Sequence, residues 1–74
     1  MPPVPIVRGD KVVRALERAG FEIARVRGSH FVMKHPDGRS VPVPVHSGQD
    51  MPRGTFRSIA TIAQIAVEDL IELL

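Results

Sequence analysis

The segment from Ser40 to His46 constrains the fold of this chain more than any other, because valine and proline alternate in it. Valine at every second position is typical of a strand that buries one face. Proline has no backbone N–H to give to a neighbouring strand, so Pro42 and Pro44 restrict the segment to a sheet edge. The pattern therefore predicts an edge strand whose valines face a core and whose prolines face outward.

Two further β-rich runs come before this strand, Phe21 to Arg27 and Ser29 to His35. In the second run Phe31 and Met33 are predicted to face the core. Cross-strand partners share one face of a sheet, so the register with the edge strand requires a loop with an odd number of residues. The residues from Pro36 to Gly38 fit as a three-residue loop, with proline opening a type I turn and glycine in the left-handed position.

This register predicts which polar residues lie on the outer face of the sheet. His30 and Lys34 point outward, and His30 faces Pro44 on the edge strand. His46 becomes the diagonal neighbour of His30, and diagonal partners lie roughly 7 to 8 Å apart. Two histidines are therefore predicted within reach of one bound phosphate. The same parity aims His35 towards the core side, which indicates a structural role.

Helical patterns flank the three strands. Residues 1–8 contain three prolines and are predicted to be extended, with Asp10 capping a first helix and Gly20 ending it. A second helix is predicted to begin near Gly54, after a polar loop over residues 47–53. Apolar residues recur at helical spacing in both helices: Val12 or Val13, Leu16 and Ala19 in the first, and Phe56, Ile59, Ile62 or Ala63, and Ala66 in the second.

Residues 67–74 form another amphipathic segment, either a short third helix or a continuation of the second. The order helix, three-stranded antiparallel sheet, helix predicts an α+β fold, and it is the order found in double-stranded RNA-binding domains. A chain of 74 residues is the size of one small domain. We therefore predict a single domain over residues 1–74, with an extended N-terminal segment and a C-terminal helical segment.

The charges of the chain are unevenly distributed. Residues 8–57 hold all ten Lys and Arg against five acids, a balance of +5, whereas residues 58–74 hold three acids and no base. The basic excess surrounds residues 28–30, as expected if the ligand is a polyanion such as RNA. A solvated arginine-rich surface would have the same pattern.

The composition excludes several classes of protein. Hydrophobic residues make up 43% and charged residues 24%, which is ordinary for a globular domain. The absence of cysteine excludes disulfides and thiolate zinc sites and permits a reducing compartment. The first residues lack the pattern of a signal peptide, and the apolar stretch from Ile59 to Val67 is too short to span a bilayer. We therefore predict a cytoplasmic protein that does not bind membranes.

Gly28-Ser29-His30 is the segment most suggestive of a reactive site. Glycine lets a phosphate approach closely, serine offers a hydroxyl, and histidine has an unperturbed pKa of about 6.5. RNA carries its own nucleophile, the 2′-hydroxyl, so a base, a stabiliser of the phosphorane and an acid suffice to cleave it. We assign His30 as the base, Ser29 and the Gly28 backbone as phosphate contacts, and Arg27 as the charge stabiliser. The tripeptide alone also fits a turn that enters a strand.

Two more polar residues complete the candidate site. Lys34 lies four strand residues from His30, about 13 Å away, and is assigned a flanking phosphate. His46 is either the acid or a polar strand end. The carboxylates are scattered and no two histidines stand four residues apart on a helix, which disfavours a metal site, so no cofactor is expected.

Five ordered motifs of the chain match one family of proteins. They are Leu16-Glu17-Arg18-Ala19-Gly20-Phe21, Arg27-Gly28-Ser29-His30, His35-Pro36-Asp37-Gly38-Arg39, Val43-Pro44-Val45-His46 and Gly54-Thr55-Phe56-Arg57-Ser58-Ile59. Through them the chain resembles the HicA family of toxins, also called YcfA-like, over roughly residues 9–71. The resemblance implies an endoribonuclease acting on mRNA, an mRNA interferase, which a HicB-type antitoxin holds inactive. It also implies that His30 is the catalytic residue.

The chain departs from the family pattern near its C-terminus. Members of the family commonly close the second helix with Ala-Gly and cap the next helix with Ser, whereas this chain has Gln64 and Ala66. Because both stop signals are missing, the sequence leaves open whether the last two helices are separate or run together.

Two other function classes fit the same residues. A noncatalytic double-stranded RNA-binding module would use the basic surface without cleaving RNA. A protein-interaction domain would have no affinity for RNA. The three phenylalanines, with no Trp or Tyr, argue against single-strand recognition by base stacking.

Overall fold

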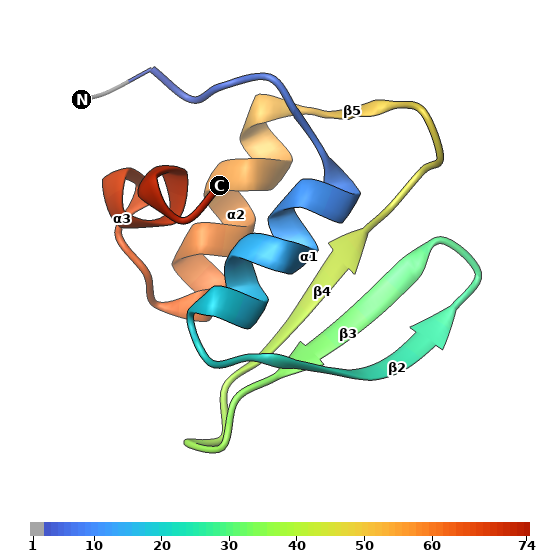
Figure 1. Ribbon diagram of the computed structural model, residues 1–74, viewed down its shortest axis with the longest axis vertical. Coiled ribbons are helices and arrows are strands. Elements are labelled where there is room, and N and C mark those ends of the chain that lie inside the picture. Colours follow the sequence, from blue (N-terminus) through green and yellow to red (C-terminus); the bar gives the residue numbers. More distant parts are fainter. Residues whose placement is uncertain (1–2) are drawn as a thin grey trace.

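In the computed structural model, which describes residues 3–74, a three-stranded antiparallel sheet packs one face against two helices, and a third helix follows (Figure 1). The α+β class and the order helix, three strands, helix are as predicted. Along the chain the elements are β1 (Val7–Arg8), α1 (Gly9–Arg18), β2 (Glu22–Arg27), β3 (His30–Lys34), β4 (Ser40–Pro44), β5 (Asp50–Met51), α2 (Arg53–Ala63) and α3 (Val67–Glu72).

The proline-containing strand lies at a sheet edge, as predicted. The strand order is β2-β3-β4, so β4 has a neighbour on one side. The N–H of Val45 donates to the carbonyl of Ser29. Hydrogen-bonded residues alternate along an antiparallel strand, so the odd-numbered residues of β4 bond to β3. The ring nitrogens of Pro42 and Pro44 therefore face away from β3, and no bond between the strands is lost.

The register between β3 and β4 is also as predicted. His30 pairs with Pro44 and Lys34 with Ser40, so the connection is closed by the three-residue loop of residues 36–38. Gly38 has φ +102°, and its N–H donates to the carbonyl of His35 at 2.9 Å. The side chains on the inner face are buried against the helices, Met33, Val41 and Val43 completely.

The first helix ends as predicted but begins differently. Gly20 has φ +97°, its N–H donates to the carbonyl of Glu17, and the next N–H reaches the carbonyl of Leu16. These two bonds are a Schellman motif, which favours glycine at the left-handed position. The prediction that Asp10 caps the helix is wrong, because Arg8 occupies the cap position and, within residues 3–74, forms no side-chain capping bond to the helix backbone. Asp10 lies inside the first turn, where its carboxylate pairs with Arg8 at 3.3 Å.

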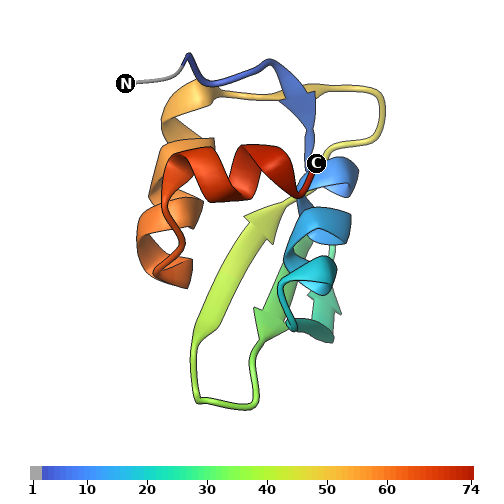
Figure 2. The same ribbon diagram turned by 60° about the vertical axis from the view of Figure 1, so that its left-hand side comes forward.

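A small second sheet joins two segments that were expected to be an extended terminus and a loop. In this sheet Val7 pairs with Met51 and Arg8 with Asp50, at the end of the molecule opposite the β3–β4 turn (Figure 2). Met51 is buried, and so is Val4 just before the sheet. Strands of two residues carry no periodic signal, so the sequence pattern could not indicate them.

The last two helices are separate, which decides between the two alternatives that the sequence left open. Helix α2 ends at Ala63, and Gln64 adopts the left-handed conformation with φ 59°. The N–H of Gln64 donates to the carbonyl of Thr61 and the N–H of Ile65 to that of Ala60, the same two bonds that end α1. Glutamine thus occupies the position that glycine fills in α1. Ala66, predicted on the apolar stripe of α2, is exposed and precedes α3.

Replacing Gln64 by glycine is expected to stabilise the protein by about 0.5 to 1 kcal/mol. A left-handed residue with a Cβ is strained by about 1–2 kcal/mol, and the greater freedom of glycine in the unfolded chain offsets part of that relief. Urea unfolding followed by circular dichroism measures the difference. Gln64→Ala keeps the strain and is the matched control, so equal stabilities of the two variants would contradict the strain at this position.

Candidate functional site

A tight hairpin turn positions the predicted base. Arg27 and His30 are paired across β2 and β3, so Gly28 and Ser29 form a two-residue loop. Gly28 has φ +56° and Ser29 does not have a positive φ, the pattern of a type II′ turn with glycine at its first central position. Ser29 was predicted to begin the strand and lies in the turn instead. The turn makes His30 the first residue of the central strand.

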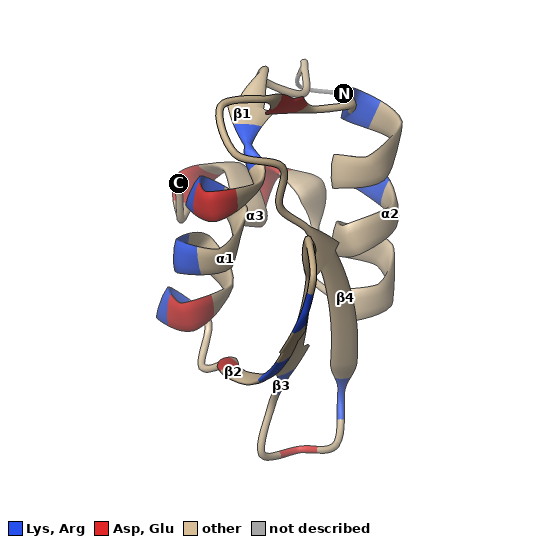
Figure 3. Ribbon diagram, turned by 90° about the vertical axis from the view of Figure 1, so that its right-hand side faces the viewer, with Lys and Arg blue, Asp and Glu red and all other residues tan. Residues whose placement is uncertain are grey.

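The outer face of the sheet collects basic side chains. Because paired residues share a face, His30 lies between Arg27 on β2 and Pro44 on β4, on the side away from the helices. Lys34 lies on the same face at the other end of β3, and Arg25, paired with Val32, lies between them along β2. The Lys and Arg positions on β2 and β3 are blue in Figure 3. Arg25 was not among the predicted site residues. Its spacing of two residues from Arg27 in a predicted strand could have placed both on one face.

His30 is open to a ligand. Its side chain is exposed, and within residues 3–74 no side-chain hydrogen bond or ion pair holds its ring. Both ring nitrogens are therefore available to groups of a substrate lying on the outer face. Arg27 and Lys34 are also exposed, so the three side chains form one solvent-facing surface.

His46 lies outside the strand in which it was predicted. Strand β4 ends at Pro44, and after Val45 the chain turns, with the N–H of Gln49 donating to the carbonyl of His46 at 3.0 Å. The diagonal arrangement with His30 required the strand to continue to His46, so that prediction is wrong. His46 instead lines a surface hollow of about 270 Å³, whose other lining residues are Arg8, Asp10, Val45, Ser47 and Gly48.

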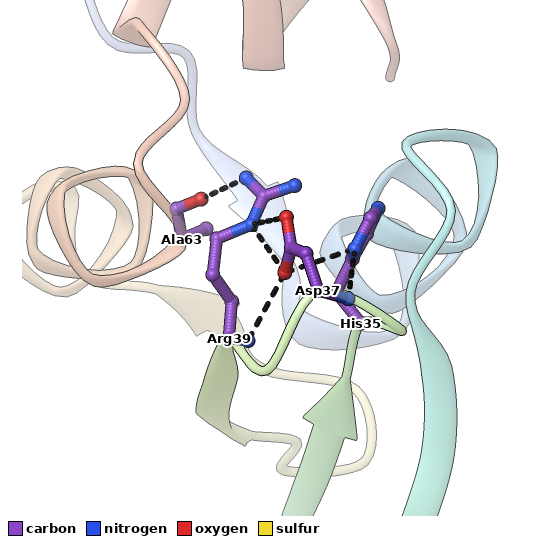
Figure 4. Close-up of polar contacts among 4 residues, drawn as sticks. All are labelled: His35, Asp37, Arg39 and Ala63. Atoms are coloured by element: carbon purple, nitrogen blue, oxygen red, sulfur yellow. Dashed lines mark hydrogen bonds and ion pairs between the residues drawn. The ribbon is translucent and has the colours of Figure 1, made fainter.

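His35 is structural, as predicted. Its ring packs edge-on against Phe21, with 5.1 Å between the ring centroids, and its Nε2 lies against Gly20, where an added Cβ would be 2.9 Å away. Its Nδ1 is 3.1 Å from the backbone nitrogen of Asp37 and 3.0 Å from Oδ1 of the same residue (Figure 4). The backbone N–H of Asp37 donates to Nδ1, and this bond holds the ring against the turn.

Arg39 connects this turn to both main helices. Its Nε donates to the two carboxylate oxygens of Asp37 at 2.8 and 3.1 Å, and its NH1 donates to the carbonyl of Ala63 at the end of α2 (Figure 4). Its guanidinium carbon lies 5.0 Å from the ring centroid of Phe21, which follows α1. The hydrogen bond from Arg39 holds the pKa of Asp37 below its usual value. The cluster therefore fixes the hairpin to the helices.

Among residues 3–74, no three His, Asp or Glu side chains lie close enough together to hold a metal ion. Over the same residues, no helix is both long and apolar enough to cross a membrane.

Comparison with known proteins identifies one family. A family model described as "HicA toxin of bacterial toxin-antitoxin" matches residues 9–65, from the first residue of α1 to just beyond α2. Curated proteins yield no match to the chain.

Proposed function

Because the chain belongs to the HicA toxin family, we propose that it is an endoribonuclease that cleaves mRNA and is neutralised by a HicB-type antitoxin. The observation that carries the proposal is the exposed His30, which begins the central strand between Arg27 and Pro44 on a basic face. A solvent-facing strand surface suits a long substrate, which a closed pocket could not admit.

The proposed reaction begins at the 2′-hydroxyl of RNA. His30 removes its proton, the oxygen attacks the adjacent phosphorus, and the 5′-oxygen leaves with a proton taken from water or a nearby acid. Arg27, the Ser29 hydroxyl and the backbone N–H groups of the turn stabilise the charge that develops on the phosphorane. The product is a 2′,3′-cyclic phosphate.

Residues farther from His30 are proposed to bind the rest of the RNA. Lys34, at the far end of β3, is placed to meet a flanking phosphate about 13 Å away. Arg25 lies between the two along β2 and extends the same basic track. His46 is proposed to contact a nucleotide that enters the hollow beside Arg8. Electrostatic contacts of this kind weaken as salt is raised.

The family implies an antitoxin partner. We propose that this partner covers His30 and presents acidic groups to Arg27 and Lys34, which would exclude RNA from the same face. Opposite charges at an interface chiefly raise the rate of association, so salt should weaken the complex. The pair would act in the cytoplasm, where mRNA is found.

Incubation of the purified protein with mRNA, with and without EDTA, tests the proposal. Cleavage is expected in both reactions, with 2′,3′-cyclic or 3′-phosphate ends, because the proposed mechanism uses the 2′-hydroxyl and needs no metal ion. Loss of all cleavage in EDTA would contradict the mechanism. RNA that binds without being cut would instead identify a noncatalytic RNA-binding module.

A further inference from the structure

The sheet has one open edge. Strand β4 carries Pro42 and Pro44, whose nitrogens face outward and cannot pair with another strand. Strand β2 at the opposite edge contains no proline, and all six of its residues are exposed. Two of them are large apolar residues, Ile23, which is 42% exposed, and Val26, which is 51% exposed. An exposed apolar edge strand is a template for pairing with another strand.

The backbone groups of Ile23 and Val26 point out from this edge. The odd-numbered residues of β3 form hydrogen bonds with β4. The even-numbered residues of β3 therefore direct their backbone groups to β2. Their partners on β2 are Arg27, Arg25 and Glu22. Ile23 and Val26 lie between these partners and keep their N–H and C=O groups free for another strand.

From this edge we infer that β2 pairs antiparallel with β2 of a second copy of the chain. In the register that places Glu22 opposite Arg27 of the second copy, Ile23 lies opposite Val26. The twofold axis repeats both contacts. Each dimer then contains two pairs of opposite charges and two apolar pairs, and each kind of pair stabilises neighbouring strands.

An irregularity in β2 makes this register possible. The pairing with β3 shifts between Ile23 and Arg25, where one extra residue forms a bulge. The bulge places Glu22 and Arg27 together on the outer face, and Ile23 and Val26 together on the inner face. Without it, strict alternation would put Glu22 and Arg27 on opposite faces, and they could not meet across a symmetric pair of strands.

The dimer would join the two sheets into one with six strands. An axis perpendicular to the sheet keeps both outer faces on the same side, so His30 and Arg25 of the two copies would share a continuous basic surface. The inference does not rest on the proposed ribonuclease activity, because it follows from the pairing of β2 alone.

Sedimentation measures the dimer directly. Six-residue strands bury less surface than a standard interface, so the expected dissociation constant is about 0.1 mM. Over protein concentrations from about 2 µM to about 1 mM, the mean mass is expected to rise from 8.1 kDa towards twice that value. A mass that stays at the monomer value throughout this range overturns the inference and leaves the edge to a different protein.

Charge reversal tests the register. Glu22→Arg and Arg27→Glu each place like charges opposite each other in the homodimer, and each is expected to weaken self-association by about tenfold. An equimolar mixture of the two variants restores both opposite-charge pairs and should dimerise at least as well as the wild type. Glu17→Arg and Arg14→Glu, on the exposed side of α1, carry matched charge changes and should leave the dimer intact.

Circular dichroism confirms that each variant is folded before its mass is compared. If the mixture associates no better than either variant alone, the proposed register is wrong.

Discussion

His30→Ala is expected to lower RNA cleavage by a factor of about 10² to 10⁴, the usual contribution of a general base. No other described side chain stands at the same place on the outer face, since the flanking partners are Arg27 and Pro44. Arginine remains charged at neutral pH and proline has no titratable group, so neither replaces the base. Turnover of a defined RNA by the purified variant measures the loss.

The variant should remain folded, because His30 is exposed and its ring forms no side-chain hydrogen bond within residues 3–74. It should also still bind the antitoxin. If a folded His30→Ala protein cleaves RNA at the wild-type rate, the base lies elsewhere. If it fails to bind the antitoxin, the histidine belongs to the interface and the two roles are not separate.

His46→Ala is the matched control among the histidines. It removes an exposed imidazole from the hollow beyond β4 and leaves the hairpin turn unchanged. We expect a smaller loss of cleavage than for His30→Ala, because water can supply the proton to the leaving group. A loss as large as that of His30→Ala, with a changed profile of turnover against pH, would show that His46 takes part in the reaction.

Gly9→Ala is expected to destabilise the protein by about 3 kcal/mol, the upper part of the range for overpacked sites. Gly9 is buried where α1 begins against the end of β4. A Cβ at this position would overlap the backbone carbonyl oxygen of Pro44 and lie 3.0 Å from the Cα of Val45. Both obstacles are backbone atoms, so no side-chain rotation relieves the clash and the helix must move from the sheet. Urea unfolding measures the change.

Gly54→Ala provides the control within the same protein. Gly54 lies in the first turn of α2, and no atom of residues 3–74 approaches its Cβ position within 4 Å. Alanine there is expected to be neutral or to stabilise by up to about 0.5 kcal/mol, because it restricts the unfolded chain. Similar stabilities for the two variants would contradict the close approach at Gly9.

Much of the sheet could be predicted from the sequence because its signals are local and steric. Proline fixes an edge, the alternation of apolar residues selects a face, and a three-residue turn sets the register, so the outward position of His30 followed from neighbouring residues. The end of α1 followed from Gly20 in the same way.

Tertiary contacts decided the rest, since they depend on residues distant along the chain. The pairing of Val7 with Met51 carries no local pattern, and the hollow around His46 exists because the chain leaves the sheet at Pro44 to reach that pairing. The left-handed turn at Gln64 opposes the local preference of glutamine, and beside it Ala63 is held by Arg39 of the distant hairpin. The sequence thus determined the three-stranded sheet and the outward position of His30, while packing between distant segments determined where α2 ends and which residues surround His46.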